Sequence, residues 1–301
     1  MKELTGTDGL TGPSAATTPP RIIPVAPPYV LVQARHGWIL ANPNDFYLGR
    51  AVVEYGEYGE IESQFLGQLF IRPGAIVEVG ANSGTHTIAL ATRARQEHRP
   101  VFAFEPQPFL FQNLCANLAL NGLTHVRAWP AACGANAGTL YFDAPDYLSQ
   151  GNFGGVSMTP TSGQKSIAVS CVRLDDALAN ETIGLLKVDV EGAELDVLQG
   201  CREILKRSQP VLYVENDRVG QSRALIEWLW SQGYRLWWHL PPLFNPRNHF
   251  GSQENLYGNA VSCNMLCLPQ GMNITVEALT DITDATLHPF VRQASFGISP
   301  V

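Results

Sequence analysis

The chain has 301 residues, 45% apolar and 16% charged, and this composition excludes an intrinsically disordered or collagen-like protein. Its net charge is −7, and it has no run of Lys and Arg and no apolar stretch long enough to span a bilayer. We therefore expect neither nucleic acid nor a membrane as a partner. Residues 1–20 lack a secretory apolar segment and the cysteines are scattered, which predicts a cytoplasmic protein with reduced thiols.

The first part of the chain divides into a tail and a small extension. Residues 1–28 are rich in Gly, Thr and Pro and are predicted to form a flexible tail. Short apolar runs at 30–32 and 38–40 flank His36-Gly37 and predict a β-hairpin. Apolar residues at helical spacing then predict a helix over 62–71. We expect residues 29–72 to form this hairpin-and-helix extension.

Residues 73–270 alternate apolar strands with helices, whereas residues 271–301 are expected to be a C-terminal tail segment. Strands are predicted at 75–79, 101–104, 126–129, 183–188, 211–214, 234–239 and 260–268, and helices at 85–95, 108–121, 193–205 and 221–230. Two further strands, 140–142 and 167–171, flank a glycine-rich loop at 151–155. This alternation predicts an α/β fold with a mostly parallel, doubly wound sheet and helices on both faces.

Ligands of such sheets bind at the carboxyl ends of the strands, so the residues that follow each strand are the candidate site. The first strand is followed by a turn in which Gly80 and Gly84 permit tight backbone geometry. Asn82 stands where a dinucleotide-binding turn has its middle glycine, and its side chain hinders the approach of a pyrophosphate. Glu105-Pro106 ends the second strand, where a carboxylate binds ribose hydroxyls. Together, Asn82 and Glu105 indicate an adenosyl ligand with an amino-acid tail, and S-adenosylmethionine fits this description.

The segment 185–194 carries the most charge at any strand end. Lys187 and Asp189 face the same way because side chains alternate along a strand. Glu191 and Glu194 follow at the start of the next helix, where the helix dipole favours acids. That preference accounts for Glu194, but it leaves Lys187 and Asp189 unexplained within an apolar run.

Taken together, four motifs resemble those of the FkbM family of S-adenosylmethionine-dependent methyltransferases. They are residues 78–84 (Glu-Val-Gly-Ala-Asn-Ser-Gly), 104–106 (Phe-Glu-Pro), 173–175 (Arg-Leu-Asp) and 187–194 (Lys-Val-Asp-Val-Glu-Gly-Ala-Glu). The resemblance covers roughly residues 35–268. It implies a Rossmann-like class I methyltransferase domain over 73–270, with a seven-stranded sheet whose last strand is antiparallel. It also implies O-methylation of a sugar or natural-product hydroxyl, with N-methylation of a peptide side chain as an alternative.

The resemblance assigns roles by motif position. It implies that the methionine part of the cofactor is held by Glu78, Gly80, Asn82 and Gly84, and the ribose by Glu105 with Pro106. It places Ala132 near adenine. Asn152, in the glycine-rich loop, is either a residue of a loop that folds over the cofactor or an ordinary turn asparagine.

Methyl transfer to a hydroxyl requires positioning and removal of a proton. The end of the fourth major strand faces the transferred methyl group in this family, so Asp189 is the first candidate for substrate orientation or general base. Lys187 is expected to pair with it and to lower its pKa. Glu215 and His239, at the ends of the next two strands, are further candidates, although a lone histidine is more often structural.

Two features leave alternatives open. Asp189 with Glu215-Asn216 resembles the layout that holds Mg²⁺ in catechol-type methyltransferases, and hard oxygen ligands suit that ion. The aromatic-rich segment 237–257 either walls a substrate pocket or packs on the core. More distant alternatives are an NAD-dependent oxidoreductase and a non-catalytic scaffold. The acceptor, a small molecule or a peptide, is not specified by any motif, and neither is the oligomeric state.

Overall fold

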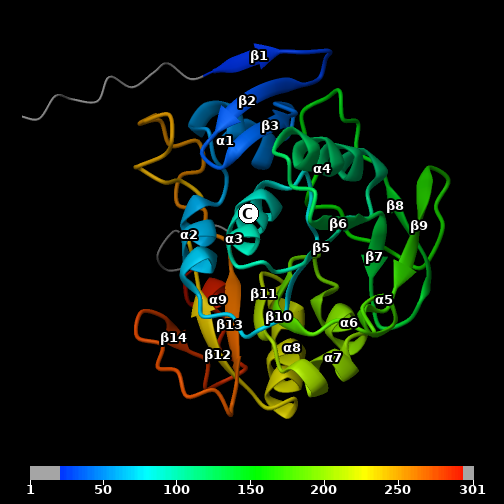
Figure 1. Cartoon of the computed structure of the whole chain (residues 1–301), viewed down its shortest axis with the longest axis vertical. Helices are drawn as coiled ribbons and strands as arrows, with labels where there is room; N and C mark the ends of the chain where they lie inside the picture. The colour runs from blue at the N-terminus through cyan, green and yellow to red at the C-terminus, as the bar shows by residue number, and fades with distance from the viewer. Residues whose placement is uncertain (1–20, 294–301) are drawn as a thin grey trace, which may run out of the picture.

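A computed structural model describes residues 21–293, which centre on an eight-stranded sheet (Figure 1). The strand order is β14-β12-β13-β11-β10-β4-β5-β6. The strands are β4 (Ala75–Val79), β5 (Val101–Phe104), β6 (Val126–Trp129), β10 (Ile183–Val188), β11 (Val211–Glu215), β12 (Tyr234–His239), β13 (Asn264–Pro269) and β14 (Thr280–Asp281).

Seven of these strands form the predicted sheet. The five neighbouring strands β11, β10, β4, β5 and β6 pair in parallel. Strand β13 lies between β11 and β12 and is antiparallel to both. The predicted count of seven strands is wrong because β14, from the segment expected to be a C-terminal tail, adds an antiparallel edge strand to β12. The chain continues into α9 (Pro289–Gln293), so residues 271–293 belong to the fold.

Each face of the sheet carries its own core. One face packs against α1 (Leu48–Tyr55), α2 (Glu60–Gln68), α3 (Thr85–Gln96) and α4 (Pro108–Leu120). The other packs against α5 (Leu174–Ala177), α6 (Glu194–Gln199), α7 (Arg202–Ser208) and α8 (Val219–Ser231). Side chains alternate along each strand, so Ile76 enters the first core and Val77 the second. Burial on both faces explains why these strands are continuous apolar runs.

A single helix was predicted over 193–205, but two helices lie there. A Cβ atom at Gly200 would stand 2.0 Å from the carbonyl oxygen of Gly134, so the chain between the helices packs directly on another backbone segment. The second helix, α7, is capped from outside by Asp175, whose carboxylate accepts the backbone N–H groups of Glu203 and Ile204 at 3.1 and 2.9 Å. The Arg-Leu-Asp motif therefore has a structural role at a helix N-terminus.

The N-terminal extension is larger than predicted. A small sheet comprises β1 (Ile22–Pro24), β2 (Val30–Ala34) and β3 (Gly37–Ala41), and it is followed by α1 as well as the expected α2. Because β1 pairs with β2, the predicted tail ends before residue 22, and its residues 1–20 lie outside the described part of the chain. Asn117 of α4 and Asn121, which follows that helix, accept the N–H groups of Leu40 and Trp38 and fix the hairpin on the domain.

A third sheet lies beyond β6, on the right of Figure 1. It consists of β7 (Ala131–Cys133), β9 (Ser166–Val172) and β8 (Gly138–Asp143), in that order. The loop between β8 and β9 contains the glycine-rich segment and meets the N-terminal extension. Phe46 donates its N–H to the oxygen of Gly151, and Gly151 donates to the oxygen of Asn44, at 2.9 and 3.0 Å.

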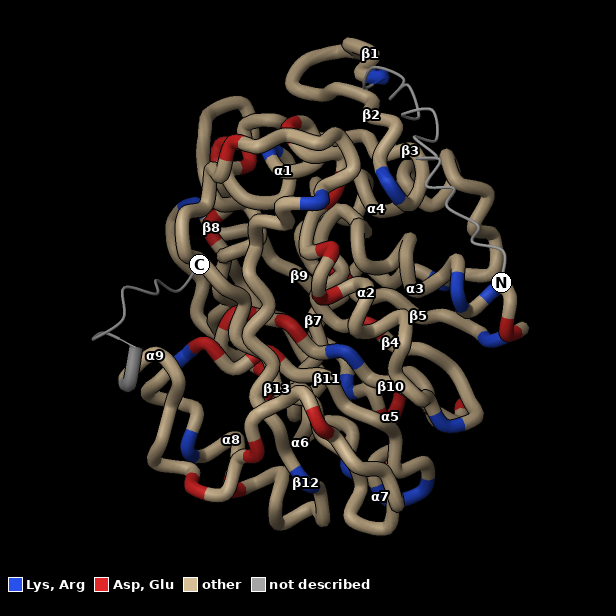
Figure 2. The backbone as a smooth tube through the Cα atoms, turned by 90° about the vertical axis from the view of Figure 1, so that its left-hand side faces the viewer, with Lys and Arg blue, Asp and Glu red and all other residues tan. Residues whose placement is uncertain are grey.

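Charged positions are spread along the described chain, and Lys and Arg alternate with Asp and Glu over many elements (Figure 2). Among the described residues, no helix has both the length and the apolar character needed to cross a bilayer.

Candidate active site

A large cavity opens at the carboxyl ends of the central strands. It encloses about 1450 Å³ of space, part of it open to solvent. Its floor is formed by residues at the ends of β4, β5, β10 and β11, and its walls come from the N-terminal extension, the glycine-rich loop and the segment after β12. This is the position predicted for a ligand of a doubly wound sheet.

The turn after β4 is shaped by its glycines. Gly80 has φ 88°, and a Cβ there would lie 1.7 Å from the carbonyl oxygen of Asp189. Asn82 and Gly84 also have positive φ, at 50° and 91°. Such a conformation is easily reached by glycine and tolerated by asparagine, which explains the residue types in this motif.

Glu105 lies beside this turn with both carboxylate oxygens engaged. One oxygen accepts the N–H of Asn82 and the other the N–H of Gln107, each at 2.8 Å. Burial raises the pKa of Glu105 to about 7 in spite of these two hydrogen bonds. Each oxygen keeps one further lone pair, so the carboxylate can still accept hydrogen bonds from a diol.

The glycine-rich loop covers this half of the cavity. A Cβ at Gly154 would stand 2.7 Å from Nδ2 of Asn82, so the loop backbone lies directly on that side chain. Asn152 accepts the N–H of Gly155 at 2.9 Å, as a turn asparagine does, and it also lines the cavity. The turn role of Asn152 is thus observed, and its place in the cavity lining is compatible with a loop over the cofactor. Ala132 and Pro106 line the same half.

Lys187 lies at the centre of three carboxyl groups. Its Nζ is 2.8 Å from Oδ2 of Asp189 and 3.8 Å from Oε1 of both Glu62 and Glu78, and its side chain is 1% exposed. Burial disfavours its charge, but the three carboxyl groups outweigh burial and raise the pKa of Lys187. Glu78 in turn accepts a 2.6 Å hydrogen bond from the hydroxyl of Thr87. The unexplained lysine of the motif is thus the cation of a buried cluster.

Asp189 is paired as the sequence predicts. Burial acts against its ionisation, but the ammonium group of Lys187 outweighs burial and holds the pKa of Asp189 below its usual range. Its side chain is 32% exposed and faces the cavity. Glu215 also lines the cavity, and burial raises its pKa well above the usual value. The structure therefore brings Asp189, Lys187 and Glu215 together.

Two predicted residues lie elsewhere. His239 does not line the cavity. Its Nδ1 is 2.7 Å from the hydroxyl oxygen of Tyr213, and its ring centroid is 4.1 Å from that of Phe65. Asn216, the amide of the possible magnesium layout, is buried and donates to the sulfur of Met265 at 3.2 Å. Among the described residues no group of three His, Cys, Asp or Glu side chains is placed to hold a metal. The residues present do not fit the magnesium alternative.

Sequence reasoning missed the residues that form the other half of the cavity. Asp45, Tyr47 and Tyr58 reach it from the N-terminal extension, Glu62 from α2 and His86 from α3. A signal for Glu62 was present: with Phe65, Leu66 and Leu69 it shares one helical stripe, in which it is the charged member. A carboxylate on the buried side of an amphipathic helix calls for a functional or structural explanation.

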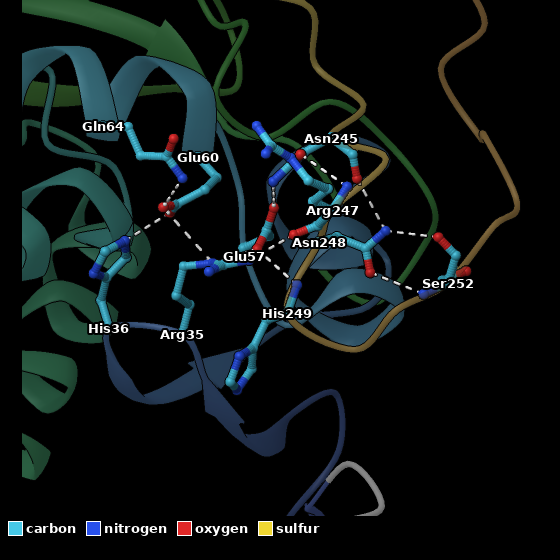
Figure 3. A network of polar contacts seen from close by, with 10 residues as sticks. All are labelled: Arg35, His36, Glu57, Glu60, Gln64, Asn245, Arg247, Asn248, His249 and Ser252. Carbon is cyan, nitrogen blue, oxygen red and sulfur yellow. Dashed lines mark hydrogen bonds and ion pairs between the residues drawn. The ribbon is translucent and has the colours of Figure 1, made fainter. Parts of the chain in front are cut away.

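The segment after β12 completes this second half. It contributes Leu243 and residues 261–263 to the cavity, and none of the aromatic side chains of 237–257 lines it, so those aromatics pack elsewhere. The segment is held by Glu57, whose carboxylate accepts hydrogen bonds from Arg35 at 2.6 Å, Asn245 at 2.8 Å and the N–H of His249 at 2.8 Å (Figure 3).

Comparison with known proteins identifies the family of the chain. A model of the methyltransferase FkbM domain matches residues 78–236. The methyltransferase sdnD of Sordaria araneosa is 32% identical over 162 residues, which cover 42% of this chain and 60% of that protein. The 31-O-demethyl-FK506 methyltransferase FkbM of Streptomyces tacrolimicus is 31% identical over 207 residues, covering 58% of this chain and 78% of that protein.

Among solved structures, the FkbM methyltransferase of Methylobacillus flagellatus is 16% identical with a TM-score of 0.42, covering 64% of this chain and 43% of that one. The chain spans less than two thirds of the length of the first two curated relatives that it matches, at 60% and 57%. The matching segment of the family runs from Glu78 through the Lys187–Asp189 pair, so it contains the motifs that line the cavity floor. The chain belongs to the FkbM family of methyltransferases.

Proposed function

We propose that the protein transfers a methyl group from S-adenosylmethionine to a hydroxyl of a small, uncharged acceptor such as a sugar or a natural product. The observation that carries this proposal is a single cavity containing the glycine turn at Gly80, the strand-end carboxylate of Glu105 and the charged Lys187–Asp189 pair. Each supports a different part of the function: cofactor binding for the first two, and chemistry for the third.

The residues around Glu105 fit the cofactor. A carboxylate with free lone pairs at the end of the second strand suits a ribose diol. The turn at 80–84 presents backbone groups and the amide of Asn82, which suit an amino-acid tail better than a pyrophosphate. Gly80, Asn82, Gly84, Glu105, Pro106, Ala132 and Asn152 would hold the cofactor, as would Glu78 by supporting the turn. S-adenosylmethionine, when bound, supplies an activated methyl group.

The acceptor half of the cavity favours a substrate without negative charge. Carboxyl groups of Glu62, Glu191, Glu215 and Asp217 line it, and the ammonium group of Lys187 is enclosed by its own carboxylates. An anionic acceptor would meet repulsion there, because like charges at short range in a partly buried site are costly. A relative named as a 31-O-demethyl-FK506 methyltransferase supports transfer to an oxygen of a small molecule, and one named as a hexuronic acid methyltransferase supports a sugar, although a hexuronic acid is itself anionic.

In the proposed reaction, the chain contributes positioning, exclusion of water and movement of a proton. Asp189 accepts a hydrogen bond from the acceptor and orients it, because its lowered pKa keeps it ionised. Lys187 holds that carboxylate in one rotamer through the 2.8 Å contact. The glycine-rich loop over Asn82 limits the access of water to the cofactor half.

Calorimetric titration of chelator-treated protein tests this function. We expect micromolar binding of S-adenosylhomocysteine, unchanged by Mg²⁺, and no heat with NADH. Binding of NADH would instead favour an oxidoreductase, and a heat that requires Mg²⁺ would restore the metal-assisted alternative. An absence of binding for both nucleotides would leave a scaffold that has the fold but no active site.

A further inference from the structure

We infer that Glu62, on α2, is the group that accepts the proton from the acceptor hydroxyl. The inference rests on the proposed function, and it assigns the base to a residue outside the matching segment of the family, 78–236. Asp189 then orients the acceptor, and Glu62 removes its proton.

The position of Glu62 carries the inference. Its side chain lines the cavity although the residue is only 4% exposed. Oε2 accepts a hydrogen bond from the amide of Asn264 at 3.3 Å, whereas the buried Oε1 has no hydrogen-bond partner. A buried carboxylate oxygen without a hydrogen bond is costly unless a ligand supplies one. Because this side chain lines the cavity, the hydroxyl of a bound acceptor is the group suited to donate a hydrogen bond to Oε1.

The other carboxyl groups nearby are already committed. Asp189 is bound to Lys187 at 2.8 Å, Glu78 to the hydroxyl of Thr87 at 2.6 Å, and Glu105 to two backbone N–H groups. Glu215 also has a buried oxygen without a partner, but burial raises its pKa well above the usual value, and its carboxyl group is hydrogen-bonded to that of Asp189. Glu191 and Asp217 form ion pairs with Arg218, and Asp45 accepts the N–H of Tyr47 at 3.1 Å. Glu62 is left as the cavity carboxylate that is able to take a proton.

The surroundings tune Glu62 for this step. The titratable and charged groups that face it are Lys187, Asp189, His86, Tyr58 and Tyr213, and Glu78 lies on the other side of the Lys187 ammonium group. Burial raises the pKa of Glu62 to about 7, against the opposing effect of Lys187. A base is most effective when its pKa lies near the working pH. Proton uptake by Glu62 also removes a negative charge from a cluster in which one ammonium group serves three carboxyl groups.

The step balances without another reactant. A lone pair of the acceptor oxygen forms the new O–CH₃ bond, the pair of the S–CH₃ bond returns to sulfur, and the hydroxyl proton passes to Oε1 of Glu62. The products are the methyl ether and S-adenosylhomocysteine, and Glu62 later releases its proton to solvent through the open cavity.

The first test needs no acceptor. Protein labelled with ¹³C at the glutamate side-chain carboxyl carbon is titrated between pH 5 and pH 9 by NMR, with and without S-adenosylhomocysteine. Glu62→Gln identifies the signal by its loss. We expect that signal to titrate with a midpoint between pH 6 and pH 8. A midpoint below pH 5.5, or no titration in this range, would overturn the inference even if S-adenosylhomocysteine binds.

The second test uses a panel of sugars and phenols with radiolabelled S-adenosylmethionine. For any compound that the wild type methylates, Glu62→Gln should lower kcat at least about 100-fold, the range of general-base catalysis, and should abolish the rise of kcat with pH. Binding of S-adenosylhomocysteine should stay within threefold. The matched control is Glu60→Gln, on the same helix, since Glu60 is buried but binds His36 and Gln64 instead of lining the cavity. Glu62→Gln that keeps kcat within tenfold of wild type would refute the role, whereas failure of the wild type to bind S-adenosylhomocysteine would refute the proposed function instead.

Discussion

Lys187 and Asp189 lie on one side of the sheet at the end of β10, with Nζ 2.8 Å from Oδ2, and the lysine side chain is 1% exposed. Lys187 also faces Glu78 of β4, beside the turn assigned to the cofactor, and Glu62 of α2, in the part of the cavity assigned to the acceptor. The pair therefore lies where the two parts of the cavity meet. The pair is therefore part of the architecture of the site as well as of its proposed chemistry.

Lys187→Met should destabilise the protein by about 3 kcal/mol, because it leaves buried carboxyl groups without their cation. Urea unfolding followed by tryptophan fluorescence measures this change. Lys206→Met is the control: its side chain is 73% exposed, it pairs with Glu203 at the surface, and the expected change is within about 0.5 kcal/mol. Equal stability of the two variants would contradict the buried cluster.

Glu105→Ala should weaken binding of S-adenosylhomocysteine at least tenfold. It removes the acceptor for the ribose and also leaves the N–H groups of Asn82 and Gln107 unpaired, at a cost of about 1–3 kcal/mol each. Glu105→Gln keeps one carbonyl acceptor and should lie between Ala and wild type. Calorimetry gives the three affinities, with the exposed Glu227→Ala as control. Unchanged affinity in Glu105→Ala would remove this residue from the cofactor site.

Gly80→Ala should both destabilise the fold and weaken S-adenosylhomocysteine binding. The new Cβ would meet the oxygen of Asp189 at 1.7 Å on a backbone with φ 88°, so we expect a loss above about 2 kcal/mol. Gly220→Ala makes the same change in α8, where nothing lies within 4 Å, and should stabilise by about 0.5–1 kcal/mol. Thermal unfolding of both variants decides the matter, and a fully stable Gly80→Ala would show that the turn is not constrained as described.

Stability should rise as the pH falls from 8.5 to 6.5. Burial raises the pKa of Glu62 and Glu105 to about 7, above the 4.5 of an exposed Glu, so the folded state binds protons in this range that the unfolded chain does not. Each group contributes up to about 0.8 kcal/mol by linkage. Below pH 6.5 the trend should weaken, because burial lowers the pKa of His86 and His239 to about 4 and the unfolded chain then takes up their protons.

Urea titrations at pH 6.5 and pH 8.5 measure this difference. In Glu62→Gln the gain should shrink by the contribution of that one group. If stability is instead higher at pH 8.5 than at pH 6.5 in the wild type, the raised pKa values of the two glutamates are wrong.

The sheet and the cofactor half of the site were predictable because each is encoded locally. Gly80 and Gly84 mark the turn through their backbone geometry, and Glu105 follows an apolar strand. The split between α6 and α7 was not predictable, because it depends on Gly200 packing against a segment more than sixty residues away. The short strand β14 is too exposed to leave a periodic pattern.

The acceptor half escaped prediction for a different reason. Its residues come from separate regions of the chain, and only folding brings Tyr58, Glu191 and Val261 to one cavity. His239 was misplaced because the end of a strand was taken to face the cavity, whereas its side chain turns to Tyr213 and Phe65. Periodicity predicts which strand a residue ends, but neighbouring elements decide where its side chain points.

The cavity is lined both by residues of the family-matching segment and by residues before and after that segment. The motifs of the cofactor half lie within the family-matching segment 78–236, whereas Asp45, Tyr58, Glu62 and residues 261–263 lie before or after it. Glu57 binds the first of these flanking regions to the second. Part of the acceptor half is therefore encoded outside the segment that holds the family motifs, whereas Glu191, Glu215 and Asp217 lie within it. Exchange of both flanking regions together, between relatives, should redirect the enzyme to a new acceptor. Exchange of one flanking region alone should break the hydrogen bonds by which Glu57 joins the two.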